Sequence, residues 1–135
     1  MSEHLTGRCN CGAVTFEITA APVGATYCHC HRCQRRSGAA ASAQVMVEQG
    51  SVHVLTGAEE VRGWSPPDGM TKEFCGLCGS QLWSRSPDGL PRAVRMGVLD
   101  QDPGVRPTLR AWTSSAASWE PIPDDGLTRH EGPRP

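Results

Sequence analysis

The sequence predicts a mainly β fold made of short strands, and two observations carry this prediction. Short segments in which apolar and polar residues alternate recur along the chain, and no segment has the spacing of an amphipathic helix longer than two turns. Gly and Pro are frequent, with 15 and 11 residues among 135, and they are spread out as turn residues are. No linker divides the chain, so we expect one domain over residues 1–135.

The expected strands follow one another between turns. Val14, Phe16 and Ile18 alternate with polar residues, which is the pattern of a half-buried strand. Further extended segments are expected at 26–30, 41–47, 52–55, 60–64, 70–74, 81–85, 93–99 and 109–112. A short turn or a single helical turn is expected at 34–38, and the Pro- and Gly-rich chain beyond Trp119 is expected to be irregular.

Composition excludes several classes of protein. The 13 basic and 14 acidic residues nearly cancel, which argues against a generic electrostatic binder of nucleic acids or membranes. No apolar run approaches the roughly 18 residues of a membrane span. The segment from Met1 to Gly7 has neither a basic nor an apolar signal region, so we expect no signal peptide and a cytoplasmic location.

Seven cysteines in such a chain are informative through their spacing. They form three groups, which are Cys9 and Cys11; Cys28, Cys30 and Cys33; and Cys75 and Cys78. A reducing compartment disfavours disulfides, and an odd count leaves one thiol unpaired. Close pairs instead let two thiolates reach one metal ion from a single tight turn.

The seven potential ligands divide naturally into four and three. Cys75 and Cys78 need two more sulfurs for a closed tetrahedral zinc site, and the isolated pair Cys9 and Cys11 can supply them. A closed four-cysteine site is typically structural. The remaining group, Cys28 to Cys33, would keep one coordination position open, as catalytic or substrate-binding zinc sites do. The sequence therefore predicts two zinc ions per chain.

Other interpretations of the cysteines remain open but rank lower. Cys75 and Cys78 could pair with two of the central cysteines, which would leave the N-terminal pair stranded. All seven could be buried thiols that pack as small hydrophobic groups. His29 and His31 could be ligands, but in an extended segment they point opposite to Cys28 and Cys30, so we favour them as flanking groups.

Charge at the open site predicts nearby cations. Zinc with three thiolates carries one net negative charge, and a bound substrate thiolate adds a second. Arg32, Arg35 and Arg36 follow the central cysteines directly, and they could offset that charge and bind carboxylates of a peptide-like thiol. The competing interpretation is a solvated basic turn.

The cysteine-containing segments resemble a known family. Gly7-Arg8-Cys9-Asn10-Cys11-Gly12, Cys28-His29-Cys30-His31-Arg32-Cys33 and Phe74-Cys75-Gly76-Leu77-Cys78-Gly79 are similar to the glutathione-dependent formaldehyde-activating enzyme family, whose domain also occurs in the centromere protein V group. The resemblance covers roughly residues 7–119. It implies a β-tent fold with two zincs, and the same division of the cysteines into a structural four and a catalytic three.

The resemblance also implies an activity. The family joins glutathione and formaldehyde into S-hydroxymethylglutathione, a carbon–sulfur lyase type of reaction. We therefore expect a zinc-dependent enzyme that acts on a small thiol adduct, with a small-molecule thiol as its partner. The alternatives are a zinc-stabilised binding module without catalysis, a thiol or metal carrier without turnover, and a zinc-ribbon nucleic-acid binder. The balanced charge and the lack of interleaved aromatic and basic residues disfavour the last of these.

Overall fold

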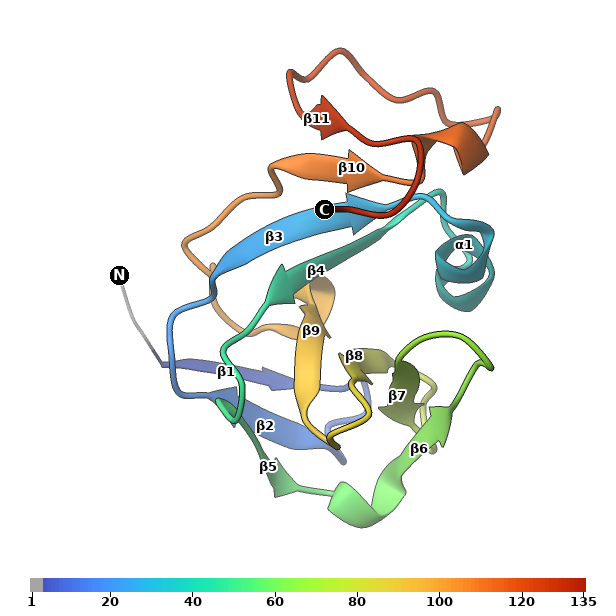
Figure 1. Cartoon of the computed structure of the whole chain (residues 1–135). Coiled ribbons are helices and arrows are strands. Elements are labelled where there is room, and N and C mark those ends of the chain that lie inside the picture. The colour runs from blue at the N-terminus through green and yellow to red at the C-terminus, as the bar shows by residue number, and fades with distance from the viewer. Residues whose placement is uncertain (1–3) are drawn as a thin grey trace.

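The computed structural model describes residues 4–135, and its ribbon is built almost entirely of strands (Figure 1). The strands are β1 Leu5–Arg8, β2 Thr15–Ile18, β3 Gly24–Cys28, β4 Ser42–Met46, β5 Val52–Thr56, β6 Val61–Trp64, β7 Thr71–Cys75, β8 Gln81–Arg85, β9 Pro91–Arg95, β10 Leu109–Ala111 and β11 Thr128–Arg129. The one α-helix among the described residues is α1, His31–Ser37, and three short 3-10 turns lie at Ala58–Glu60, Met96–Val98 and Thr113–Ser115. The predicted mainly β fold is confirmed.

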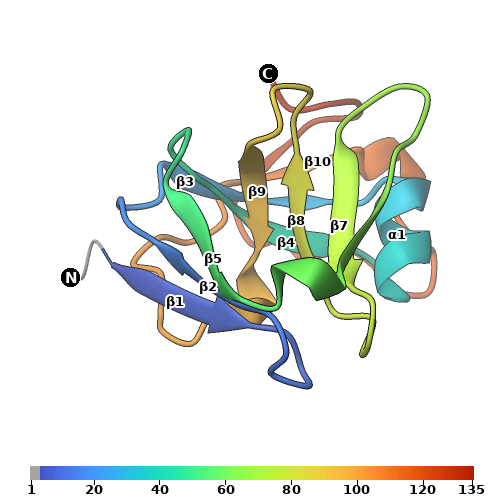
Figure 2. The same ribbon diagram turned by 90° about the horizontal axis from the view of Figure 1, so that it is seen from below.

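The strands form two open sheets. The smaller sheet has the order β1-β2-β5, and the larger one has the order β11-β10-β3-β4-β9-β8-β7-β6. In the larger sheet, β9, β8 and β7 run across the direction of β3, β4 and β10, and α1 lies beside β4 (Figure 2). Most pairs are antiparallel, but β10 is parallel both to β3 and to β11.

The core lies between the two sheets. Phe16 of β2 and Trp83 of β8 meet edge to face with ring centroids 5.2 Å apart, and both are buried. Val45 of β4 and Val94 of β9 are fully buried in the same cluster. Because Cys9 and Cys75 belong to this cluster as well, the core ends at the cysteine turns and fixes their position.

The structure departs from the expected elements in four places. Residues 93–99 do not form one strand: β9 ends at Arg95, and Met96–Val98 turn so that Leu99 can bridge to Gly7 of β1. The helix is longer than one turn, β1 was not predicted, and Thr128–Arg129 pairs with β10 although the region beyond Trp119 was expected to be irregular.

Two further expectations concern the ends of the chain and membranes. The expected lack of a signal peptide rests partly on residues 1–3, which lie outside the described residues. In the part of the chain that is described, no helix has both the length and the apolar character needed to span a bilayer.

Candidate metal and thiol site

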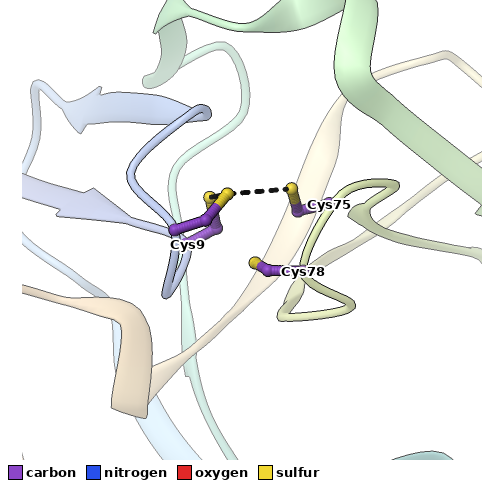
Figure 3. A group of neighbouring side chains, drawn as sticks. Cys9, Cys75 and Cys78 are labelled. Carbon is purple, nitrogen blue, oxygen red and sulfur yellow. Dashed lines mark hydrogen bonds between the residues drawn. The ribbon is translucent and has the colours of Figure 1, made fainter.

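The first cysteine group joins two distant turns. Cys9 and Cys11 lie in the turn between β1 and β2, whereas Cys75 ends β7 and Cys78 lies in the turn before β8. Figure 3 shows the sulfur atoms of Cys9, Cys75 and Cys78 pointing toward one another. All four sulfurs lie within 4.8 Å of one another. The turns are also joined directly, because the backbone N–H of Asn10 donates to Ser80 Oγ at 2.8 Å.

The spacing of these sulfurs fits a tetrahedral metal. Cys9 Sγ lies 3.6 Å from Cys11 Sγ, and Cys11 Sγ lies 3.8 Å from Cys75 Sγ. Zinc–sulfur bonds of about 2.3 Å in a tetrahedron place sulfurs about 3.8 Å apart. These separations are far longer than a disulfide bond, which is about 2.05 Å. The residues present therefore fit a four-thiolate zinc.

Backbone and side-chain donors already point at the sulfurs of this group. The N–H of Val14 donates to Cys9 Sγ at 3.3 Å, and the N–H of Leu77 donates to Cys75 Sγ at 3.4 Å. Hydrogen bonds from the hydroxyl and backbone of Ser80 lower the pKa of Cys78 to about 5. Donors arranged in this way stabilise thiolates, which are the form that binds metal.

The second cysteine group lies where β3 passes into α1. Cys28 is the last residue of β3, and Cys30 is the N-cap of α1, where its Sγ accepts from the backbone N–H of Cys33 at 3.3 Å. The helix ends at Gly38, which adopts the left-handed conformation (φ 69°) that glycine favours. The three sulfurs lie within 4.8 Å of one another, and all three residues are half-buried. A three-thiolate donor set with this compact geometry fits zinc with one open position.

Protons are shared unequally within this second group. The pKa of Cys33 is lowered to about 2, because Cys28 and Cys30 hydrogen-bond to its sulfur, and Ser42 and Arg95 add to the effect. Hydrogen bonds with Cys30 and Cys33 raise the pKa of Cys28. The neighbouring groups therefore favour the thiolate form at Cys33.

A cavity of about 180 Å³ opens over this group. Cys28 and Cys33 line it together with Lys72 of β7 and Arg95 of β9. Trp112 also lines the cavity and, alone among the described non-glycine residues, has a positive φ, of 58°. A bulky residue rarely adopts this conformation, and here backbone bonds hold it, since Trp112 N–H donates to the Gly132 carbonyl at 2.9 Å.

Two cations line the cavity with the sulfurs, and neither is paired with a carboxylate of residues 4–135. Arg95 is only 8% exposed and donates to Gln81 Oε1 and Gln44 Oε1, each at 3.2 Å. Lys72 is half-buried and donates from Nζ to Ser84 Oγ at 3.2 Å. Burial first, and then the neighbouring charge of Arg95, lowers the pKa of Lys72. The cavity floor is thus positively charged.

The three arginines singled out in the sequence have different surroundings. Arg32, Arg35 and Arg36 line a neighbouring, more open cavity with His31 and Trp64, and they do not line the cavity over Cys28 and Cys33.

Their partners also differ. Arg32 pairs with Asp68 at 3.0 Å and lies over the Trp64 ring, and Arg35 is exposed. Arg36 reaches toward the sulfur cluster, because it donates at 3.0 Å to the same Gln81 oxygen that Arg95 uses. The role of these arginines as substrate ligands stays a prediction.

The two histidines lie apart from the sulfur clusters. His29 is buried, and Arg110 donates to its Nε2 at 3.1 Å, so the ring presents a neutral acceptor there. Burial and the charge of Arg110 lower the pKa of His29. His31 is exposed at the start of α1. Neither histidine joins the sulfurs in a metal-ligating group within the described region.

Sequence reasoning missed Lys72 and Arg95. Lys72 carried a signal, although that signal did not show which way its side chain points. Lys72 is the only lysine of the chain, and it lies three residues before Cys75. Arg95 lies between Val94 and Met96 in an alternating segment, which places it opposite to the apolar face and gives no sign of its burial. The sequence offers Trp64, Trp83, Trp112 and Trp119 as residues that could line a pocket, although it favours a core or rim position for each, and the structure places Trp112 at this cavity.

Comparisons with known proteins agree with this arrangement. The sequence profile described as "Glutathione-dependent formaldehyde-activating enzyme" matches residues 4–115. A Halomonas elongata protein named "Putative glutathione-dependent formaldehyde-activating enzyme" is 30% identical over 91 residues, which are 62% of this chain and 57% of that protein. The chain thus matches a little over half of that relative's length.

A likeness in fold extends further along the chain. The crystal structure of a Rhodobacter sphaeroides protein is similar with a TM-score of 0.58 at 22% identity, over 93% of this chain and 98% of that one. At this identity the likeness concerns the fold. The match to the family profile covers most of the chain, including all seven cysteines. The chain therefore belongs to the glutathione-dependent formaldehyde-activating enzyme family.

Proposed function

We propose that the chain is a zinc-dependent carbon–sulfur lyase that joins a small thiol to formaldehyde, with glutathione as the first candidate thiol. The observation that carries this proposal is the convergence of three cysteine sulfurs at a cavity with a positively charged floor. The family match and the name of the Halomonas relative supply the two substrates.

The reaction needs little beyond a thiolate held next to a carbonyl. The thiol sulfur forms a bond to the formaldehyde carbon, and the thiol proton ends on the former carbonyl oxygen, giving a hydroxymethyl thioether. The reverse reaction breaks the same C–S bond. Zinc held by three thiolates keeps one position for a thiol and favours its ionised form.

The chain's own residues have distinct tasks in this proposal. Cys28, Cys30 and Cys33 would hold the catalytic zinc. Lys72 and Arg95 offset negative charge at the cavity floor, which lowers the cost of holding a further anion there. Trp112 adds an aromatic surface to the cavity.

A second, structural zinc belongs to the same proposal. Cys9, Cys11, Cys75 and Cys78 would hold it, because their sulfur separations fit a closed tetrahedral site. Such a site leaves no position for a substrate, so its contribution is to the stability of the fold.

The remaining expectations become parts of this proposal. Arg32, Arg35 and Arg36 would bind outlying carboxylates of a longer thiol at the neighbouring cavity. The partner is a small molecule and not a nucleic acid or a membrane. All seven cysteines are free thiols, which suits a reducing cytoplasm. Residues 1–135 would act as one domain.

Turnover of the proposed substrates tests the function. Zinc-loaded protein is mixed with glutathione and ¹³C-formaldehyde, and NMR follows the exchange between formaldehyde and its thiol adduct. We expect acceleration over the spontaneous reaction that is lost in Cys30→Ser and kept in Arg62→Met, a change of an exposed arginine on β6. Binding of glutathione without acceleration would instead favour a thiol carrier or binding module.

A further inference from the structure

The only lysine of the chain lies in the cavity over the cysteine group and has no acidic partner. Among the described residues, neither Lys72 nor the nearby Arg95 takes part in an ion pair, and no acidic residue lines the cavity. Within residues 4–135, the hydrogen-bond acceptors of these two side chains are neutral, namely Ser84, Gln81 and Gln44. Buried charge without a counter-charge is costly, so this pair needs an anion.

The cysteine group supplies only part of the negative charge that these cations need. A zinc ion with three thiolates carries one negative charge. Three positive side chains gather at it, because Arg36 shares the Gln81 oxygen with Arg95 and Lys72 lies on the same cavity floor. Two positive charges are left over. Arg134, at the cavity mouth, is exposed, so solvent screens its charge.

We propose that Lys72 and Arg95 form a carboxylate subsite, so that the preferred ligand of this site is a thiol carrying a carboxylate. The inference rests on the proposed function, because it takes the thiol sulfur to bind at Cys28, Cys30 and Cys33. A thiolate and one carboxylate add two negative charges, which balances the two that are left over. A neutral thiol leaves one cation unpaired.

The volume of the cavity limits the length of that ligand. The cavity of about 180 Å³ is smaller than the roughly 300–1,000 Å³ of sites that enclose a drug-sized molecule. Met46 and Met70 also line the cavity and add apolar, adaptable surface. A thiol and a carboxylate joined by a short aliphatic chain fit this space. Glutathione bound as a thiolate carries the same two net negative charges, with most of its length toward the mouth.

Binding of matched thiols tests the subsite without any measure of activity. Zinc-loaded protein is titrated calorimetrically with 3-mercaptopropionate and with its neutral amide, 3-mercaptopropionamide. We expect the acid to bind at least about tenfold more tightly, as a charge-assisted contact in a half-buried site provides. The preference should fall toward unity in Lys72→Met, survive in part in Lys72→Arg, and stay unchanged in Arg62→Met.

Each outcome decides the proposal. A preference for the acid that disappears only in Lys72→Met supports the subsite. Equal binding of acid and amide overturns the subsite but leaves the thiol site intact, and so does a preference that Lys72→Met does not change. If neither thiol binds while zinc remains at two per chain, the proposed function itself fails and the subsite with it. Circular dichroism and zinc content of each variant show that it is folded and loaded.

Discussion

Replacing Cys75 by serine should destabilise the protein far more than replacing Cys30. Cys11 and Cys75 are separated by 64 positions, yet their sulfurs lie 3.8 Å apart. Bringing two such positions together in an unfolded chain costs about 4 kcal/mol of conformational entropy. The unfolded chain offers this metal only pairs of cysteines that are close in sequence. A metal held by all four sulfurs therefore stabilises the folded state by at least this amount relative to the unfolded chain.

Replacing Cys30 should change the stability much less, although its group would also hold a metal. The segment from Cys28 to Cys33 is so short that an unfolded chain presents the same sulfurs, and binding to the unfolded state cancels the stabilisation. Serine also keeps the N-cap of α1, where the Cys30 sulfur accepts from Cys33 N–H. We expect Cys75→Ser to lose about 4 kcal/mol, or about 10–20 °C in Tm, and Cys30→Ser to lose less than about 1 kcal/mol.

Urea unfolding followed by tryptophan fluorescence measures both variants, with and without a zinc chelator. The chelator should bring wild type and Cys30→Ser down to the stability of Cys75→Ser, which should itself respond little. Cys75→Ala separates lost ligation from the burial of a serine hydroxyl at this fully buried position. Equal losses in Cys75→Ser and Cys30→Ser would refute the assignment of a structural four and an open three.

Three other results are expected. Elemental analysis of protein purified without added metal should give two zincs per chain, falling to one in Cys30→Ser; a value near zero in wild type would contradict both metal sites. Gly57→Ala should destabilise by more than about 2 kcal/mol, because φ is 78° and a Cβ would lie 2.0 Å from the Ala13 carbonyl oxygen. Gly12→Ala, with φ 80° and open space around it, should cost only the conformational strain, and equal losses would remove the clash from the explanation. The hydrogen bond from Arg106 lowers the pKa of Asp102 to about 2, so the stability from this pair should be present above the ordinary value of 3.8 and be lost as pH falls toward 2. Asp102→Asn should flatten that part of the pH profile in urea melts. An unchanged profile would exclude the pair as its source.

The sequence predicts the sulfur clusters well because their geometry is local or nearly so. Two thiols on one tight turn must lie close together. The fold is needed only to bring Cys9 and Cys11 close to Cys75 and Cys78. The positively charged floor of the cavity, formed by Lys72 and Arg95, could not be predicted from the sequence, for a different reason. Whether Lys72 or Arg35 faces the sulfurs depends on how β7, β9 and α1 cross, and side-chain alternation alone does not fix that crossing.

Alternation of apolar and polar residues predicted some strands correctly and others wrongly. The alternation at Val14, Phe16 and Ile18 predicted a strand at the correct place. The same alternation at Val94, Met96 and Val98 did not, because the chain turns at Gly97 to meet β1. The two-residue strand β11 has too few positions to show any period, and it forms only because β10 offers a free edge.

The parallel pairing of β10 with β3 also sets an order of events during synthesis. Ala111 is the neighbour of Cys28 in this pairing, and it leaves the ribosome about 80 residues after the cysteine group does. At roughly 5–20 residues per second, the interval is about 4–16 s. Throughout it the three thiols are complete as a group, while the wall formed by Trp112 does not yet exist. The nascent chain therefore offers these sulfurs openly to cellular zinc, or to oxidants, before its last strands arrive to enclose them.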